Sequence, residues 1–268
     1  MYPFNYHRPT SLSEAAEIFR AADDPMYLSG GMTLLATMKQ RLAAPTDLID
    51  LAGIADMTGI EVTPGHVQIG AYTTHNTVAN SPEIQQRLPV LAQLAAMIGD
   101  NQVRNRGTLG GSVANSDPSA DYPAAVVGLG ATLTTQSRTL SGDDFFLDLF
   151  ETALQPGEII TRIDFPVPTR AVYRKFPNPA SRYAVVGVLI ADFAGTVRVG
   201  VTGAGPCAFR ASGIEEVLNA SLDPAALDSI EVPDAGFNSD LHASADYRAH
   251  LVRVMARRAL GDLLAMPH

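Results

Sequence analysis

The 268-residue sequence contains a single cysteine, Cys207, and no tryptophan. One thiol cannot form an internal disulfide, and it cannot hold an iron–sulfur cluster, which takes about four cysteine ligands. The six histidines show no metal-binding spacing, so we expect no metal site in this chain. Any iron–sulfur cluster that the protein uses must therefore be carried by another chain.

Positive charge is also scarce, since only two lysines occur, Lys39 and Lys175, and the formal net charge is −9. No basic face is available to neutralise the phosphates of a nucleic acid. The sequence has no apolar run of the roughly 18 residues that a membrane span requires, and its start lacks the features of a signal peptide. We expect a cytoplasmic protein that binds no nucleic acid and does not span a membrane.

The composition that remains is that of a globular protein, with 46% hydrophobic and 18% charged residues. The length suits two unequal domains, and Pro166 with Pro168 makes a plausible boundary. Apolar periodicity predicts an α+β protein. The predicted helices cover residues 11–22, the segment after Gly31, the segment after Thr74 or Asn76, and residues 90–98, 214–219 and 247–264; the predicted strands cover residues 26–28, 48–51, 67–71, 124–134, 159–165, 173–176, 185–193 and 197–202.

Gly30 and Gly31 lie at a predicted strand-to-helix turn. Adjacent glycines let backbone N–H groups converge on an anion, and the start of a helix adds a positive dipole end. A tight connection without a ligand has the same pattern, and the segment matches neither of the common phosphate-binding motifs. The first glycine pair therefore indicates a modest anion site.

The segment 100–123 is long and polar, and we expect it to be an irregular binding loop. Gly107, Gly110 and Gly111 offer further backbone donors, and the hydroxyl and amide side chains of Thr108, Ser112, Asn115 and Ser116 lie close by. Asp117 and Asp121 would repel a phosphate, so they suit sugar hydroxyls or the polar edge of a flavin. The alternative is a glycine-rich surface loop in which Asp117 and Pro118 form an ordinary turn.

Several blocks of the sequence, taken in order, resemble the FAD-binding medium subunit of the xanthine and carbon monoxide dehydrogenase family. They include LSGGMTLLATMK, IGDNQVRNRGTLGGSVANSDPSADYPAA, GEIITRIDFP and KFPNPASRYAVVGV, and the resemblance covers essentially the whole chain. It implies a two-subdomain FAD-binding domain of the PCMH type, similar to vanillyl-alcohol oxidase, in residues 1–167, with subdomains 1–55 and 56–167. It also implies a smaller C-terminal domain in residues 168–268, with an antiparallel sheet and helices, similar to that of carbon monoxide dehydrogenase flavoproteins.

The resemblance also implies the residues that bind FAD. The pyrophosphate would be cradled by Leu28, Ser29, Gly30, Gly31, Met32, Thr33, Leu34 and Leu35, and a second clamp would consist of Thr108, Leu109, Gly110, Gly111 and Ser112. By the same comparison Asp121 binds the cofactor, Asn115 and Asp117 lie near it, and Ile98 and Ile160 make apolar contacts, although an isoleucine at the end of a helix or strand can equally be core.

Tyr183 matches the position at which carbon-monoxide-dehydrogenase-like members place an aromatic ring beside the isoalloxazine. A phenol ring can stack on a flavin and control access to it, or it can simply cover the sheet of the last domain. Some members carry a lysine where this chain has Asn178, which leaves open whether Lys175 takes that place.

No residue stands out as an acid or base for a substrate, so we predict no catalytic residue of that kind. The resemblance implies a subunit that takes electrons from [2Fe-2S] clusters on a small subunit and passes them to an external acceptor, while a large subunit carries the molybdenum cofactor. The expected assembly is a dimer of heterotrimers. The alternatives are a stand-alone flavin oxidase of related fold and a flavin-free binding module. The hydroxylated substrate and the electron acceptor stay open.

Overall fold

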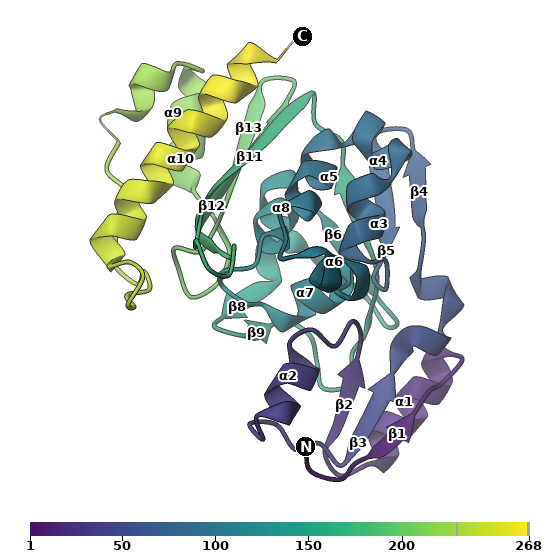
Figure 1. Ribbon diagram of the computed structural model, residues 1–268. Helices are drawn as coiled ribbons and strands as arrows, with labels where there is room; N and C mark the ends of the chain where they lie inside the picture. Colours follow the sequence, from purple (N-terminus) through teal and green to yellow (C-terminus); the bar gives the residue numbers. More distant parts are fainter. Residues whose placement is uncertain (229, 267–268) are drawn as a thin grey trace.

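The computed structural model describes residues 1–228 and 230–266, and Figure 1 shows the sheets of these residues with helices packed against them. The N-terminal unit is a parallel sheet of order β1-β3-β2. Its elements are β1 (Asn5–His7), α1 (Leu12–Ala21), β2 (Pro25–Leu28), α2 (Leu34–Lys39) and β3 (Asp47–Asp50). The Ser11 side chain caps α1 by accepting the N–H of Glu14 at 3.2 Å, which confirms the predicted helix start.

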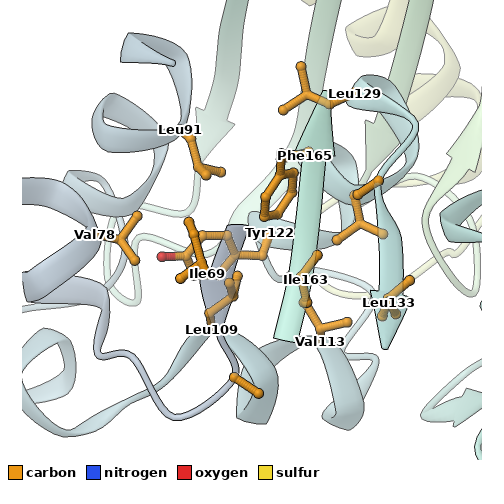
Figure 2. Packing of buried hydrophobic residues seen from close by; sticks show 14 of the residues in the cluster. Ile69, Val78, Leu91, Leu109, Val113, Tyr122, Leu129, Leu133, Ile163 and Phe165 are labelled. Carbon is orange, nitrogen blue, oxygen red and sulfur yellow. The ribbon is translucent and has the colours of Figure 1, made fainter. Parts of the chain in front are cut away.

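The middle of the chain forms an antiparallel sheet of order β4-β5-β10-β6-β7. Its strands are β4 (Ile60–Thr63), β5 (His66–Gly70), β6 (Thr132–Thr135), β7 (Thr139–Ser141) and β10 (Ile160–Pro166), and the helices of this part are α3 (His75–Asn80), α4 (Pro82–Arg87), α5 (Pro89–Ala96), α6 (Asn101–Arg106), α7 (Leu109–Asn115) and α8 (Tyr122–Leu129). Figure 2 shows the core between them, where Ile69 of β5 and Phe165 of β10 lie near Tyr122 of α8 and Leu91 of α5.

Two sequence predictions are wrong in this region. Residues 100–123 are not an irregular loop, because α6 and α7 lie within them and α8 begins there. Their polar residues act as caps: the Asp100 carboxylate accepts the N–H of Val103 at 2.9 Å, and the Thr108 hydroxyl accepts that of Gly111 at 3.1 Å.

The predicted strand 124–134 is helix α8 followed by β6. All eight residues of α8 are buried, so its sequence is apolar on every side and carries no helical periodicity. The helix ends at Gly130, whose φ of 67° gives the left-handed C-cap that glycine favours.

The last part of the chain is an antiparallel sheet of order β11-β12-β13-β14 with helices packed against it. Its elements are β11 (Arg170–Pro177), β12 (Ala184–Phe193), β13 (Thr196–Thr202), β14 (Phe209–Arg210), α9 (Ser212–Ala220) and α10 (Ala245–Ala265), and the small hairpin β8 (Phe146–Asp148) and β9 (Glu151–Thr152) precedes them in the chain. The predicted helices and strands of this part are confirmed.

Strand β12 joins the two halves of the molecule because it is buried on both faces. Leu189 and Ala191 pack into the core around α8, whereas Val188 and Ile190 pack against the core beneath α10. This alternation follows from the two-residue repeat of a strand. Within the described residues, no helix combines the length and apolarity needed to cross a bilayer.

Candidate functional site: a cavity between two glycine pairs

The two glycine pairs, far apart in the sequence, meet on one cavity of about 780 Å³. Its walls come from the β2–α2 turn, from α7 and the residues around it, from the start of β10 and from the β11–β12 hairpin. A cavity of this volume is in the range that holds a cofactor-sized ligand. The fold therefore brings the two predicted binding segments to one site.

The first glycine pair leaves several backbone donors without a protein partner. Gly31 has a φ of 75°, which glycine adopts without strain, and it lies between β2 and α2. No hydrogen bond from the N–H groups of residues 30–33 is formed to any described residue. Unpartnered amide groups beside a cavity can receive an anion such as a phosphate.

The second glycine pair has a different role from the one we predicted. The N–H groups of Gly107, Gly110 and Gly111 already donate within the protein, to Val103 O at 2.7 Å, Ala71 O at 2.8 Å and Thr108 Oγ1 at 3.1 Å. These three groups are not free donors. The glycines instead permit close packing of backbone and side chains.

That close packing joins the two segments directly. A Cβ on Gly30 would lie 2.1 Å from Arg106 O, and one on Gly111 would lie 2.7 Å from Thr108 Oγ1 and 3.3 Å from Ser29 Cβ. The Ser29 and Thr108 hydroxyls are hydrogen-bonded at 2.6 Å. The side chains of Ser112 and Asn115 line the cavity and form no hydrogen bond with any residue that the structure describes, so they can receive a polar ligand.

Asp121 lies at the cavity wall but is engaged by the β11 strand. Its carboxylate accepts the Tyr173 hydroxyl at 2.6 Å and the Lys175 ammonium at 3.0 Å. Burial raises the pKa of Asp121, and the Lys175 charge opposes that shift. Asp121 thus connects the cavity to the C-terminal sheet.

Tyr183 lines this cavity and also a smaller adjoining one of about 190 Å³. It is 45% exposed, and it follows the turn of the β11–β12 hairpin. Burial makes the largest contribution to a raised pKa of the Tyr183 phenol, and the negative charges of Asp117 and Asp121 raise this pKa further. The phenol therefore stays protonated at neutral pH. Asp117 also lines both cavities.

Most of the residues that the resemblance assigns to FAD lie at the cavity, but Leu109 and Leu35 do not, and Ser116 of the polar segment is also absent from its lining. Leu109 is fully buried in the core, and Leu35 packs beside Leu28 and Met38. Neither Lys175 nor Asn178 is among the residues that line the larger cavity. The residues assigned to FAD that do line the larger cavity are Leu28, Ser29, Gly30, Gly31, Met32, Thr33, Leu34, Ile98, Thr108, Gly110, Gly111, Ser112, Asn115, Asp117, Asp121, Ile160 and Tyr183.

Sequence reasoning missed His75, Leu154, Ile159 and Arg182, all of which line the cavity. Ile159 and Arg182 adjoin residues that were predicted, so extending each segment by one residue would have found them. His75 had no signal beyond its place after the capping Thr74. Its ring lies 5.3 Å from that of Tyr122, and its Nδ1 is buried without a hydrogen-bond partner.

His75 makes the stability of the fold depend on pH. Burial lowers its pKa to about 4, so the folded ring stays neutral while the unfolded ring takes up a proton below about pH 6.5. The unfolded state then binds more protons, and stability is lost as pH falls from 6.5 towards 4. Because of this difference in pKa, we expect His75 to lower the free energy of unfolding by about 2 kcal/mol at pH 5 relative to pH 8. His75→Phe should remove that loss in urea unfolding.

The phenyl ring of this variant can keep the contact with Tyr122, so the comparison isolates the titration. His250→Phe, at an exposed position of α10, is the control for adding an aromatic ring. Equal losses between pH 8 and pH 5 in the wild type and in His75→Phe would contradict the prediction.

The cavity lining fits FAD in both of its parts. The unpartnered amides of residues 30–33 suit the pyrophosphate, and the free side chains of Ser112 and Asn115 suit hydroxyl or ring polar groups. Ile98, Ile159 and Ile160 supply apolar walls, and Tyr183 supplies an aromatic face.

Comparisons with known proteins identify the family of the chain. Residues 2–168 match the family described as FAD binding domain in molybdopterin dehydrogenase. The chain is 34% identical to the nicotine 6-hydroxylase medium subunit of Paenarthrobacter nicotinovorans over 95% of both chains, and 34% identical to the carbon monoxide dehydrogenase medium chain of Afipia carboxidovorans over 96% of this chain and 95% of that one. Reconstituted carbon monoxide dehydrogenase from Oligotropha carboxidovorans contains a chain with a TM-score of 0.92 and 33% identity, and 99% of each chain is covered. The chain therefore belongs to the FAD-binding subunits of the molybdopterin dehydrogenase family and is an oxidoreductase subunit with FAD as its cofactor.

Proposed function

We propose that this chain is the electron-relaying subunit of a molybdenum hydroxylase. In this proposal it assembles with a large subunit that carries the molybdenum cofactor and with a small subunit that carries two [2Fe-2S] clusters, as a dimer of heterotrimers in the cytoplasm. FAD takes electrons from the clusters and releases them to an external acceptor. The observation that carries the proposal is the joining of the two glycine pairs at one cavity, in a chain that matches medium subunits along nearly its full length.

The amides of residues 30–33 would receive the pyrophosphate, while Ser112, Asn115 and Asp117 would bind sugar hydroxyls or polar atoms of the ring. Tyr183 would stack on the isoalloxazine at the wall of the cavity that the β11–β12 hairpin forms. When bound, FAD supplies the chemistry, since a flavin accepts and releases electrons singly or in pairs, and the protein supplies position and electrostatics.

We further propose that residues 1–167 form the FAD-binding domain, with subdomains 1–55 and 56–167, and that residues 168–268 form a C-terminal domain. The family match over residues 2–168 and the separate sheet of β11–β14 support this division.

Copurification from the native source tests the assembly. We expect an affinity-tagged chain to bring down two partners, one containing molybdenum and one containing iron and acid-labile sulfide, at a ratio of one to one with the tagged chain. Addition of the substrate of the complex should bleach the flavin absorbance of the purified complex and leave that of the isolated subunit unchanged. A yellow chain that purifies alone and oxidises a small alcohol would instead identify a stand-alone flavin oxidase, and a colourless one would identify a flavin-free module.

A further inference from the structure

Lys175 is buried although it lines neither cavity. Its side chain is 5% exposed, and it lies on β11 beside the hairpin that carries Tyr183. A lysine ammonium has three N–H donors, and burying one is costly unless they are all satisfied. The sequence contains only one other lysine, Lys39, which is exposed on α2. A buried ammonium outside the binding cavity therefore calls for a structural explanation.

The three donors of Lys175 reach three separate parts of the chain. Nζ lies 3.0 Å from Asp121 Oδ2, 3.2 Å from Met97 O and 2.8 Å from Arg182 O. Each acceptor is in or next to the cavity wall, since Asp121 lines the cavity, Met97 precedes Ile98 and Arg182 precedes Tyr183. One ammonium thus ties together the start of α8, the end of α5 and the hairpin.

The β11–β12 hairpin requires hydrogen bonds of this kind because its backbone is strained at Arg182. Arg182 has a φ of 65°, a left-handed conformation that is costly for a residue other than glycine and persists only where surrounding contacts hold it. Its N–H donates to Asn178 O at 2.8 Å and its carbonyl accepts from Lys175. The backbone conformation that delivers Tyr183 to the cavity is therefore fixed from both sides of residue 182.

We propose that Lys175 is a positioning residue that holds the Tyr183 hairpin against the segment 97–100 beside the flavin cavity. Removal of its ammonium would release Arg182 O and Met97 O together, and the hairpin would swing away from the cavity. The consequence for FAD rests on the proposed function, whereas the consequence for the hairpin does not.

The test uses a Tyr183→Trp background, because the natural sequence has no tryptophan and the introduced indole reports on the hairpin alone. Acrylamide quenching of its fluorescence is measured on the FAD-free full-length chain. Lys175→Met should raise the quenching constant about 3-fold, and hydrogen exchange should accelerate in residues 97–100 and 178–183 while α10 is unchanged. Lys39→Met is the matched control and should change neither readout.

Lys175→Met alone leaves the Asp121 carboxylate buried without its counter-ion and can unfold the chain. Asp121→Asn combined with Lys175→Met removes both charges, and it is compared with Asp121→Asn alone, in which the ammonium still reaches Arg182 O and Met97 O. The proposal is upheld if only the double variant shows the increased quenching. Equal quenching in the folded single and double variants overturns it.

A second measurement adds FAD to the same proteins without the Tyr183→Trp change. The double variant should bind FAD about 10-fold more weakly than Asp121→Asn. The wild-type chain is titrated alongside, because both variants lack the Asp121 carboxylate that lines the cavity. If the wild type binds no FAD either, the proposed function fails while the quenching result stands. If FAD binds equally to both although quenching differs, Lys175 holds the hairpin but the hairpin does not contribute to FAD binding, and only the expected consequence for FAD is overturned.

Discussion

Gly111→Val is expected to lose FAD, with a dissociation constant at least about 100-fold above that of the wild type. A Cβ at this position would lie 2.7 Å from Thr108 Oγ1 and 3.3 Å from Ser29 Cβ, so a valine side chain would force apart the hydroxyl pair that joins the two segments. The amides of residues 30–33 would then move away from α7. FAD content after mild purification and titration of the FAD-free chain measure the effect.

Gly213→Val provides the matched control for this substitution. Gly213 lies in the first turn of α9, as Gly111 lies in the first turn of α7, and a Cβ there meets no atom within 4 Å. Both variants should keep the far-ultraviolet circular dichroism of the wild type, and only Gly111→Val should lose FAD. Full FAD occupancy in Gly111→Val would rule out the second clamp.

Glu158→Gln is expected to lower the unfolding free energy by about 3 kcal/mol at pH 7, because it breaks a buried ion pair. The Glu158 side chain is 3% exposed and accepts hydrogen bonds from Arg138 Nε and Nη2 at 2.8 Å, from the Thr135 hydroxyl at 2.8 Å and from the Gln155 N–H at 2.8 Å. Arg138 is 37% exposed and keeps some hydration, which places the loss at the low end for buried pairs. Urea unfolding measures it.

The same pair has a defined pH dependence. Hydrogen bonds from Arg138 above all lower the pKa of Glu158 from 4.5 to about 2. A depressed pKa stabilises the fold above the unfolded value, so the contribution is complete above pH 4.5 and is lost as pH falls towards 2. The difference between wild type and Glu158→Gln should therefore shrink below pH 4.5.

Asp262→Asn is the control for this prediction. Its partner Arg174 is 50% exposed and Asp262 is 44% exposed, so the loss should stay below about 1 kcal/mol. A loss of equal size in the two variants would show that the network around Glu158 adds nothing beyond a surface pair.

The sequence was sufficient for the elements whose pattern is regular. The continuous, valine-rich apolar run of β12 and the apolar stripe of α10 predict both elements, and the capping hydroxyl of Ser11 predicts the start of α1. Helix α8 could not be predicted in this way, because burial on every side removes the periodicity that separates a helix from a strand.

The sequence located most of the segments that line the cavity, but it did not indicate the contacts that their residues make. The sequence predicts that Gly110 and Gly111 offer N–H groups to a ligand. In the structure the Gly110 N–H donates to Ala71 O and the Gly111 N–H to the capping Thr108 hydroxyl, which leaves the glycines a steric role. His75 and the partners of Lys175 depend on contacts between distant parts of the chain, which no local pattern contains. The cavity is a property of the tertiary fold.

Strand β12 restricts how related subunits can exchange parts during evolution. Its two faces belong to different cores, one around α8 and one beneath α10. Recombination at Pro166–Pro168 would combine α8 of one parent with β12 of another. Side chains that did not fit together would leave voids between α8 and β12, next to Asp121 and the cavity. Viable chimaeras of this subunit would therefore inherit α8 and β12 from the same ancestor.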